Sequence, residues 1–192
     1  MTTMNLGTEL TAMVTPFDDD GGLDLDAAAE LARWLVANGN DGVVVAGTTG
    51  EAPTLSVDEH LALTAAVRQA VPDAVVIAGT GSNDTRHAMR TTERAAELGV
   101  DAILSVTPYY NRPSQAGMIQ HFTMVADVTD LPILLYDIPV RTGRKLTTDT
   151  MLRLFELPNV VGVKDAAGNP GETARLLSLA PEGTWSTPAT TS

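Results

Sequence analysis

The sequence predicts an α/β fold, specifically a (β/α)8 barrel that is incomplete in this chain. Three observations predict it: six short β-branched runs, helix signals between those runs, and a repeat of about 30 residues. A barrel of about 250 residues has roughly 31 residues per unit, which matches this repeat. A doubly wound open sheet also fits the alternation. A dinucleotide-binding sheet would show G-x-G-x-x-G after its first strand, and this chain has none there, so the barrel is favoured.

The predicted strands are apolar on both faces, as in parallel sheets that helices cover. They cover residues 10–17, 42–47, 74–81, 101–108, 131–139 and 160–165. Helix signals lie between them: Ser56 and Glu59 form a capping box, and Pro72 ends that helix. A helix over 83–99 begins at a capping Asn or Asp, and another begins at Asn169 with Pro170 just inside. These signals predict about six β/α units, so a barrel of eight units would be incomplete in this chain.

Composition limits the classes of partner. The 192 residues include 12 basic and 24 acidic side chains, and the net charge of −12 disfavours nucleic acid or an anionic membrane surface. The chain has no cysteine, which excludes disulfides, thiolate catalysis and cysteine zinc sites. It shows neither the pattern of a signal peptide nor an apolar run of the roughly 20 residues that span a bilayer. We therefore expect a cytoplasmic protein.

Catalytic groups of parallel α/β folds lie at the carboxyl ends of the strands, and this chain has polar residues there. The ends carry Thr15, the turn 47–51, the glycine–threonine turn 79–81, the segment 107–111, Tyr136, Arg141 and Lys164. The three histidines lie inside helical segments, so we interpret them as surface or helix-packing residues. No metal-ligand spacing is present, and no metal is expected.

Lys164 closes an otherwise apolar run, "VVGVKDAAG". A lone lysine in such a place is most often a strand reaching the surface. A lysine in a barrel mouth would instead have a lowered pKa, since burial disfavours the ammonium form, and its neutral amine could form a Schiff base with a ketone. Tyr136 could pass protons to and from that amine, with Thr48 or Thr49 supplying an orienting hydroxyl. Taken alone, Tyr136 is more often a packed core aromatic.

Two further groups could bind carboxylates. The backbone N–H groups of "GTTGE" (47–51) could hold one at the strand-to-helix turn, and the guanidinium of Arg141 could hold a second. A solvated loop arginine is the simpler interpretation of Arg141 by itself. The segment "TPYYN" could likewise be a proline turn with two packed rings.

Together these motifs resemble the dihydrodipicolinate synthase family, a pyruvate-dependent class I aldolase branch of the (β/α)8 barrels. The resemblance rests on "GTTGE" (47–51), "VTPYYNRP" (106–113), "LYDIPVRTG" (135–143) and "GVKDAAG" (162–168), and covers residues 8 to about 183. It implies a lyase that condenses pyruvate with aspartate semialdehyde to 4-hydroxy-tetrahydrodipicolinate, on the route to diaminopimelate and lysine. A related aldolase, such as an N-acetylneuraminate or keto-sugar-acid lyase, is a second interpretation. A non-catalytic fragment is a third.

The resemblance also assigns roles to matching residues. Lys164 would carry pyruvate as a Schiff base without a cofactor, and Tyr136 would relay protons through Thr48 to Tyr110. Thr48 and Thr49, with Gly47 and Gly50 of the same turn, would hold the pyruvate carboxylate. Arg141 would receive the carboxylate of the aldehyde.

The same resemblance implies a homo-oligomer, a dimer or tetramer, in which Tyr110 reaches a neighbouring subunit's site. It also implies a lysine-binding site with Asn83, His60 and Tyr109. Val57 and His87 stand where a histidine and a glutamate are usual, so we predict weak or absent inhibition by lysine.

The end of the chain does not resemble this family. The resemblance implies that the last two β/α units and a C-terminal helical region are missing here. We expect residues 1–183 to form the partial catalytic domain and 184–192 an aberrant tail. Shifting one codon choice for "STPATTS" by two bases gives Tyr-Ser-Gly-Asp-Asp-Val, and family members often read Ser-Gly-Asp-Asp at strand seven. Residues from about Ser186 onward are therefore predicted to be a frameshifted strand seven. A natural or deliberate truncation is the alternative.

Overall fold

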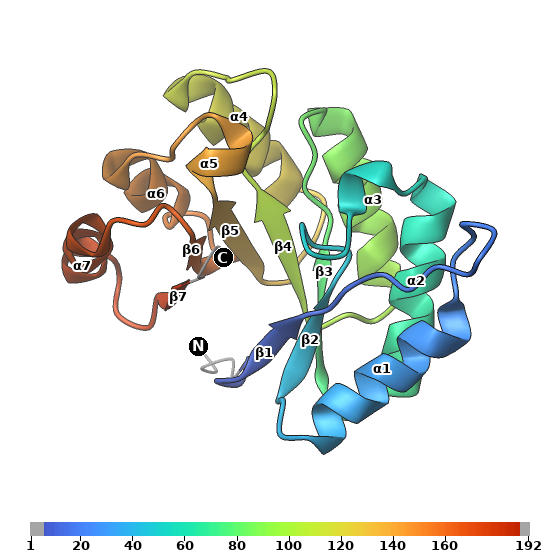
Figure 1. The fold of residues 1–192 in the computed structure, drawn as a ribbon. Helices are drawn as coiled ribbons and strands as arrows, with labels where there is room; N and C mark the ends of the chain where they lie inside the picture. The colour runs from blue at the N-terminus through green and yellow to red at the C-terminus, as the bar shows by residue number, and fades with distance from the viewer. Residues whose placement is uncertain (1–5, 189–192) are drawn as a thin grey trace. The chain divides into compact units, whose positions relative to one another are not determined.

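The computed structural model describes residues 6–188 as alternating strands and helices (Figure 1). In chain order the elements are β1 (Leu10–Ala12), α1 (Leu25–Ala37), β2 (Gly42–Val45), the 3-10 helix η1 (Ala52–Thr54), α2 (Val57–Ala70), β3 (Val75–Gly79), α3 (Thr85–Glu97), β4 (Ala102–Val106), α4 (Gln115–Ala126), β5 (Ile133–Asp137), α5 (Pro139–Thr142), α6 (Thr148–Leu154), β6 (Val160–Asp165), α7 (Pro170–Leu179) and β7 (Trp185–Pro188). They form two compact units, Met1–Thr80 with Glu93–Ile103 and Gly81–Thr92 with Leu104–Ser192. We call these the first and the second unit.

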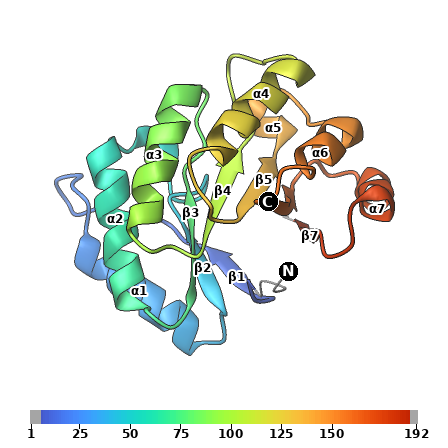
Figure 2. The ribbon, with the colours of Figure 1, turned by 180° about the vertical axis from the view of Figure 1, so that it is seen from behind.

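In the first unit, β1, β2 and β3 pair in parallel in the order of the chain. All four residues of β2 are buried, as the apolar pattern on both faces predicted. Helices α1 and α2 pack against each other on one face of these strands (Figures 1 and 2). Gly42 is required where β2 approaches β3, because a Cβ there would lie 2.1 Å from the carbonyl oxygen of Val75.

The helix signals of the sequence are confirmed. Ser56 and Glu59 form the capping box at the start of α2, which ends at Val71, just before Pro72. Asp84 supplies the cap of α3, since its Oδ1 accepts the N–H groups of Arg86 and His87. Asn169 caps α7, with a proline in the first turn. Each cap satisfies amide groups that the helix itself leaves unpaired.

In the second unit, β5, β6 and β7 also pair in parallel and in the order of the chain. Every residue of β5 is buried. The end of β4 reaches β5, because the N–H and the hydroxyl of Thr107 both donate to the carbonyl of Tyr136, at 2.9 and 3.1 Å. Helix α6 lies between α4 and α7 and contacts both (Figure 2).

Two features of the second unit differ from the six predicted units. The connection from β5 to β6 contains two helices, α5 and α6, instead of one. Gly143, at φ +68°, ends α5, and Thr147 caps α6 by accepting the N–H of Thr150. The left-handed region suits glycine, so the first helix stops there and a second begins.

The structure also adds a seventh strand to the six predicted ones. β7 pairs with β6 in the register Gly162–Trp185 to Asp165–Pro188, so strand structure extends into the predicted tail over 184–192. The close approach again depends on glycine, because a Cβ on Gly162 would lie 2.0 Å from the carbonyl oxygen of Trp185. The frameshift stays a prediction, and residues 189–192 lie outside the described part of the chain.

The first strand is shorter than the predicted 10–17. β1 covers Leu10–Ala12, and the N–H of Met13 still donates to the carbonyl of Val44. Pro16 has no N–H to continue such a ladder. Phe17 instead forms an isolated antiparallel bridge with Leu23, across the acidic turn at Asp18–Gly22.

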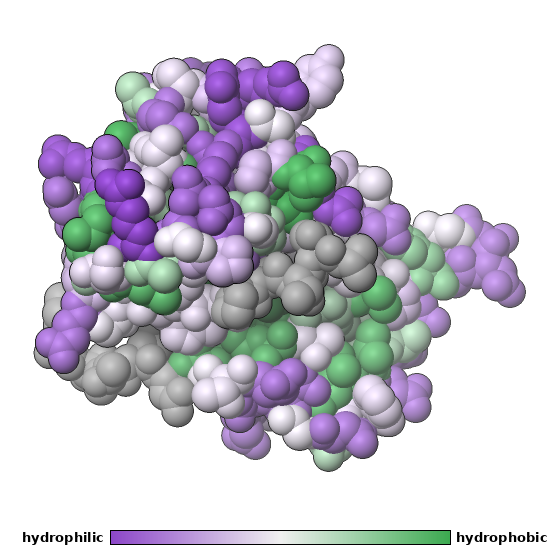
Figure 3. Space-filling model, turned by 60° about the vertical axis from the view of Figure 1, so that its left-hand side comes forward, coloured by the Kyte–Doolittle hydropathy of each residue, from purple (hydrophilic) through white to green (hydrophobic). Residues whose placement is uncertain are grey.

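Among the helices within residues 6–188, none combines the length and apolar character needed to cross a membrane. On the side of α7, apolar side chains lie among hydrophilic ones at the surface (Figure 3). Leu177 and Leu179 of α7 are 46% and 53% exposed.

Candidate active site

Lys164 and Tyr136 lie side by side on neighbouring strands of the second unit. They are register partners in β6 and β5, and the Lys164 Nζ lies 4.5 Å from the centroid of the Tyr136 ring. Lys164 is half-buried and Tyr136 is 5% exposed. Within the described part of this unit, Nζ has no hydrogen-bond acceptor or carboxylate partner. Burial therefore lowers the pKa of Lys164, which favours the neutral, nucleophilic amine.

The backbone at Tyr136 is fixed from the neighbouring strand. Its carbonyl accepts both donors of Thr107, and Thr107 is itself fully buried. A buried backbone carbonyl that accepts two hydrogen bonds moves little. The backbone from which the Tyr136 ring and hydroxyl extend is therefore fixed in position. Tyr136 is thus a packed core aromatic and also the contact of Lys164.

The turn "GTTGE" belongs to the first unit and is tightly hydrogen-bonded. Gly47 O accepts the N–H groups of Gly50 and Ala52, and Thr48 O accepts that of Glu51. The hydroxyl of Thr15 holds Gly50 from β1's side, at 2.6 Å from the carbonyl oxygen. A Cβ on Gly50 would lie 3.1 to 3.3 Å from that hydroxyl and from backbone atoms, so the site fits glycine closely.

This turn leaves two backbone donors available within the described part of the first unit. No hydrogen bond there uses the N–H of Thr48 or of Thr49. Thr48 is half-buried and Thr49 is exposed. Two adjacent amides of this kind can bind a carboxylate, and this role of the turn stays a prediction. The predicted link from Thr48 to Tyr136 stays a prediction.

The β4–α4 connection of the second unit holds Tyr110 in an unusual backbone conformation. Tyr110 has φ +67° and is 88% exposed, and Arg112 has φ +50°. Asn111 fixes the turn by donating from its side chain to the carbonyl of Asn83, at 3.0 Å. Non-glycine residues in the left-handed region are uncommon and collect at functional sites. The role of Tyr110 stays a prediction.

Arg141 lies in the second unit, on the four-residue helix α5 that directly follows β5. Its side chain is exposed. The helix ends at Gly143, where a Cβ would lie 2.7 Å from the Nε of Arg112. The segment is therefore packed against the β4–α4 connection, and its role in binding a carboxylate stays a prediction.

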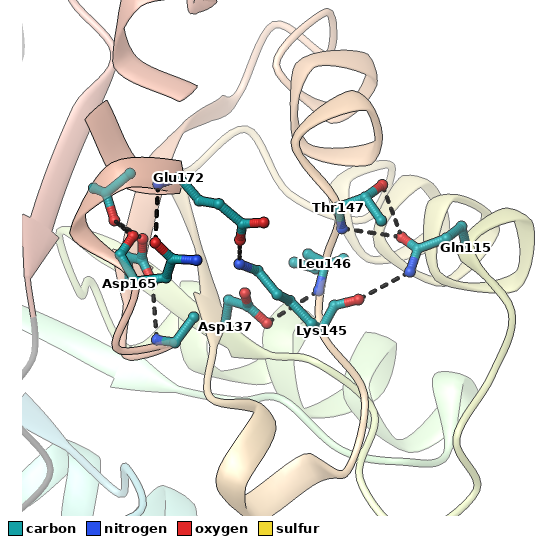
Figure 4. A network of polar contacts seen from close by, with 10 residues as sticks. Gln115, Asp137, Lys145, Leu146, Thr147, Asp165 and Glu172 are labelled. Carbon is teal, nitrogen blue, oxygen red and sulfur yellow. Dashed lines mark hydrogen bonds and ion pairs between the residues drawn. The ribbon is translucent and has the colours of Figure 1, made fainter. Parts of the chain in front are cut away.

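Sequence analysis did not select two acidic residues, Asp137 and Asp165, which follow the central pair along β5 and β6. Figure 4 shows their polar contacts. Asp137 follows Tyr136 and Asp165 follows Lys164, and the two are themselves register partners. Burial raises the pKa of Asp137 to about 6, with a further contribution from the charge of Asp165. The only sequence signal for them is an acidic residue at the end of each of two predicted strands. Acidic residues are also common there as ordinary turn residues, so this signal does not single out a functional residue.

The histidines are helix-packing residues. His60 and His121 are buried, and His87 is half-buried. The Nδ1 of His121 lies 2.9 Å from the Thr85 hydroxyl, and burial lowers its pKa to about 4. Within residues 6–188, no group of three His, Cys, Asp or Glu side chains is arranged to hold a metal ion.

The residues predicted to contact lysine are placed as follows. Asn83 belongs to the β3–α3 connection and Tyr109 to the β4–α4 connection, both in the second unit. Val57 and His60 belong to α2 in the first unit. His87 lies on the first turn of α3. The weak response to lysine stays a prediction.

Comparison with known proteins gives consistent matches over almost the whole chain. Residues 5–185 match the model of the dihydrodipicolinate synthetase family. A 4-hydroxy-tetrahydrodipicolinate synthase of Synechococcus sp. is 52% identical over 179 residues, covering 93% of this chain and 58% of the relative. The corresponding protein of Acidothermus cellulolyticus is 56% identical over 164 residues, covering 85% and 53%. The chain thus spans less than two thirds of these relatives.

Solved structures agree. A dihydrodipicolinate synthase from Bacillus anthracis superposes with a TM-score of 0.93 at 43% identity, covering 95% of this chain and 63% of that one. The chloride-inhibited enzyme from Acinetobacter baumannii, solved in complex with pyruvate, gives a TM-score of 0.92 at 40% identity, covering 95% and 63%.

Proposed function

Because the chain belongs to the dihydrodipicolinate synthetase family, we propose that it carries the Schiff-base chemistry of the 4-hydroxy-tetrahydrodipicolinate synthases. In this proposal it condenses pyruvate with aspartate semialdehyde. The observation that carries the proposal is the half-buried Lys164 amine, placed against the Tyr136 ring. Among the described residues of the second unit it has no carboxylate partner. The pyruvate bound to the Acinetobacter baumannii relative supports the choice of first substrate.

The chemistry follows from a neutral amine next to a phenol. Lys164 Nζ attacks the ketone carbon of pyruvate, and the ketone oxygen leaves as water after two proton transfers that Tyr136 relays. The imine makes the methyl group acidic, and loss of a methyl proton gives an enamine. The enamine carbon attacks the aldehyde carbon, whose oxygen takes up a proton. The amino group of the aldehyde substrate then attacks the imine carbon, closes the ring and releases Lys164.

The other residues supply binding and orientation. The amides of Thr48 and Thr49 would hold the pyruvate carboxylate, and Arg141 would hold that of the aldehyde. No cofactor is needed, since the lysine imine itself is the electron sink. We extend the proposal to a (β/α)8 barrel, supported by the parallel strands in chain order, and to a cytoplasmic homo-oligomer. The exposure of Tyr110 supports a contact with a second copy.

A direct assay tests the proposal. The full chain is incubated with pyruvate and aspartate semialdehyde, and the condensation product is measured by mass spectrometry, with N-acetylmannosamine and sugar-acid aldehydes as competing acceptors. We expect product with aspartate semialdehyde and none from the Lys164→Arg variant. Preference for a sugar acceptor would favour the related lyases. No product beside an active Synechococcus relative would favour a non-catalytic fragment.

A further inference from the structure

The two acids at the ends of β5 and β6 face away from the amine and the phenol. Side chains alternate along a strand, so Asp137 and Asp165 point to the opposite face from Tyr136 and Lys164. Asp137 is fully buried. A carboxyl group in such a place requires hydrogen-bond partners or a proton.

Only one oxygen of Asp137 has a partner among residues 6–188. Its Oδ1 accepts the N–H of Leu146 at 3.1 Å, whereas Oδ2 is buried and makes no hydrogen bond (Figure 4). The charged groups around it are Asp165 of β6 and Lys145, which precedes Leu146. Lys145 is itself paired with Glu172 of α7. When Oδ2 carries a proton, Asp137 has no unpaired buried charge. When that proton is lost, the carboxylate is charged and its Oδ1 becomes a stronger hydrogen-bond acceptor for the Leu146 N–H.

The bond from Asp137 holds the far end of the segment that carries Arg141. That segment runs from α5 through Gly143 to Thr147. Gln115 of α4 holds it at two more points: its Nε2 donates to the carbonyl of Lys145 at 2.9 Å, and its Oε1 accepts the N–H of Thr147 at 3.2 Å (Figure 4). Leu146 lies between these two points. The two Gln115 bonds join neutral groups, whereas the bond from the Leu146 N–H to Asp137 changes in strength when Asp137 gains or loses a proton.

We propose that Asp137 is a positioning residue for Arg141, which it orients through the Leu146 N–H according to whether Oδ2 carries a proton. The inference rests on the proposed function, in which Arg141 receives the carboxylate of the second substrate. The first half-reaction, imine formation on Lys164, does not involve Arg141. Asp137 therefore acts on the second substrate and not on the first.

Backbone nuclear magnetic resonance of the full chain, labelled with nitrogen-15, tests the inference between pH 4.5 and 7.5. We expect the amide of Leu146 to move downfield with a midpoint near pH 6, and the amide and Nε–H of Arg141 to move with the same midpoint. Asp137→Asn keeps the shape and an acceptor oxygen, and it should abolish both titrations. Only signals that Asp137→Asn removes are attributed to Asp137.

Two neighbouring variants supply controls that leave Asp137 in place. Asp165→Asn removes a negative charge that raises the pKa of Asp137, so both midpoints should move to lower pH. Lys145→Gln removes a positive charge that lowers this pKa, so both should move to higher pH. These opposite shifts keep the inference testable even if Asp137→Asn does not fold.

The inference would be overturned if the chemical shift of the Leu146 amide did not change with pH. It would also be overturned if that shift changed while the Arg141 signals did not. A kinetic readout separates positioning from folding: Asp137→Ala should raise KM for aspartate semialdehyde about tenfold and leave the rate of borohydride trapping of pyruvate unchanged. Loss of trapping in the unmodified chain would instead refute the proposed function. The two failures are thus distinguishable.

Discussion

The two faces of β5 and β6 at their carboxyl ends are built differently. On one face Lys164 lies against Tyr136 and has no acidic partner among the described residues of this unit. On the other face Asp137 and Asp165 accept three hydrogen bonds, from the N–H groups of Leu146 and Ala167 and from the hydroxyl of Thr173. A single residue step along each strand separates the acids from the amine.

This separation decides the charge of the lysine. A carboxylate close to Lys164 would favour the ammonium form and raise its pKa, which would remove the nucleophile. On the opposite face the same carboxylates hold the loops that follow the strands and leave the amine unpaired. Successive side chains of a strand point to opposite faces. One pair of strands can therefore place an amine on one face and two acids on the other, although they are neighbours in the sequence.

The largest expected effect comes from replacing the amine itself. Lys164→Arg should reduce the yield of borohydride-trapped pyruvate by more than about 100-fold, because a guanidinium does not form the imine. Lys145 is the other lysine of the chain and provides a matched control. Lys145→Arg should leave the yield unchanged. Equal losses in both variants, measured by intact mass, would contradict the assignment of the nucleophile.

Next in size is the effect of removing the phenol hydroxyl. Tyr136→Phe keeps the ring beneath the amine and should slow imine formation by about 100-fold, the lower end of general acid–base contributions. Tyr109→Phe is the matched control and should have little effect. The measurement is the rate of adduct formation under a fixed borohydride excess. An unchanged rate in Tyr136→Phe would mean that protons travel by another group.

Two buried groups of the second unit, Asp137 of β5 and His121 of α4, should show opposite pH dependences of stability. Asp137 has its pKa raised to about 6, so its contribution to stability is lost as pH rises from about 4 to 6. His121 has its pKa lowered to about 4, so its contribution is lost as pH falls from 6.5 to about 4. Each is worth about 3 kcal/mol at most, at 1.36 kcal/mol for each pKa unit. In the unmodified chain the two slopes largely offset each other.

Single variants should expose these slopes. In Asp137→Asn the free energy of unfolding should rise with pH between 4 and 6.5, and in His121→Gln it should fall over the same range. Urea unfolding at a series of pH values measures both. Parallel curves for the two variants would show that the two groups do not titrate as their burial implies.

The smallest expected effect comes from removing the hydrogen bond between the Thr107 hydroxyl and the backbone carbonyl of Tyr136. Thr107→Val keeps the shape and the N–H donor but removes the hydroxyl that donates to the Tyr136 carbonyl. The loss should cost about 1 kcal/mol in unfolding free energy, the usual size for one hydrogen bond. Thermal unfolding of this variant beside Thr49→Val, at an exposed position, checks it. Equal changes in the two variants would mean that the buried bond contributes nothing specific.

Much of the fold was predictable because buried parallel strands and capped helices have clear sequence patterns. The runs that became β2 and β5, the capping box at Ser56 and the cap at Asn169 are confirmed. The contact between Tyr136 and Lys164 followed from their places at the ends of successive strands.

Other features depend on tertiary contacts that local patterns do not specify. β7 is a short strand that, within residues 6–188, pairs with β6 alone, and its sequence carries no strand signal. Tyr110 adopts a positive φ that its residue type does not favour. The hydrogen-bond donor to the buried Asp137 is Leu146, nine residues further along the chain. An acid in a strand-end position looks the same in sequence whether it is exposed or enclosed.

The most direct test of the central claim is borohydride trapping of pyruvate on the unmodified chain over pH 6 to 10, followed by peptide mass mapping. The chain has two lysines, so the labelled peptide identifies the nucleophile without ambiguity. We predict an adduct on Lys164, with a rate that levels off below the pKa of 10.5 usual for a lysine, as its partial burial implies. An adduct on Lys145, or none beside a relative of full length that labels, would contradict the account.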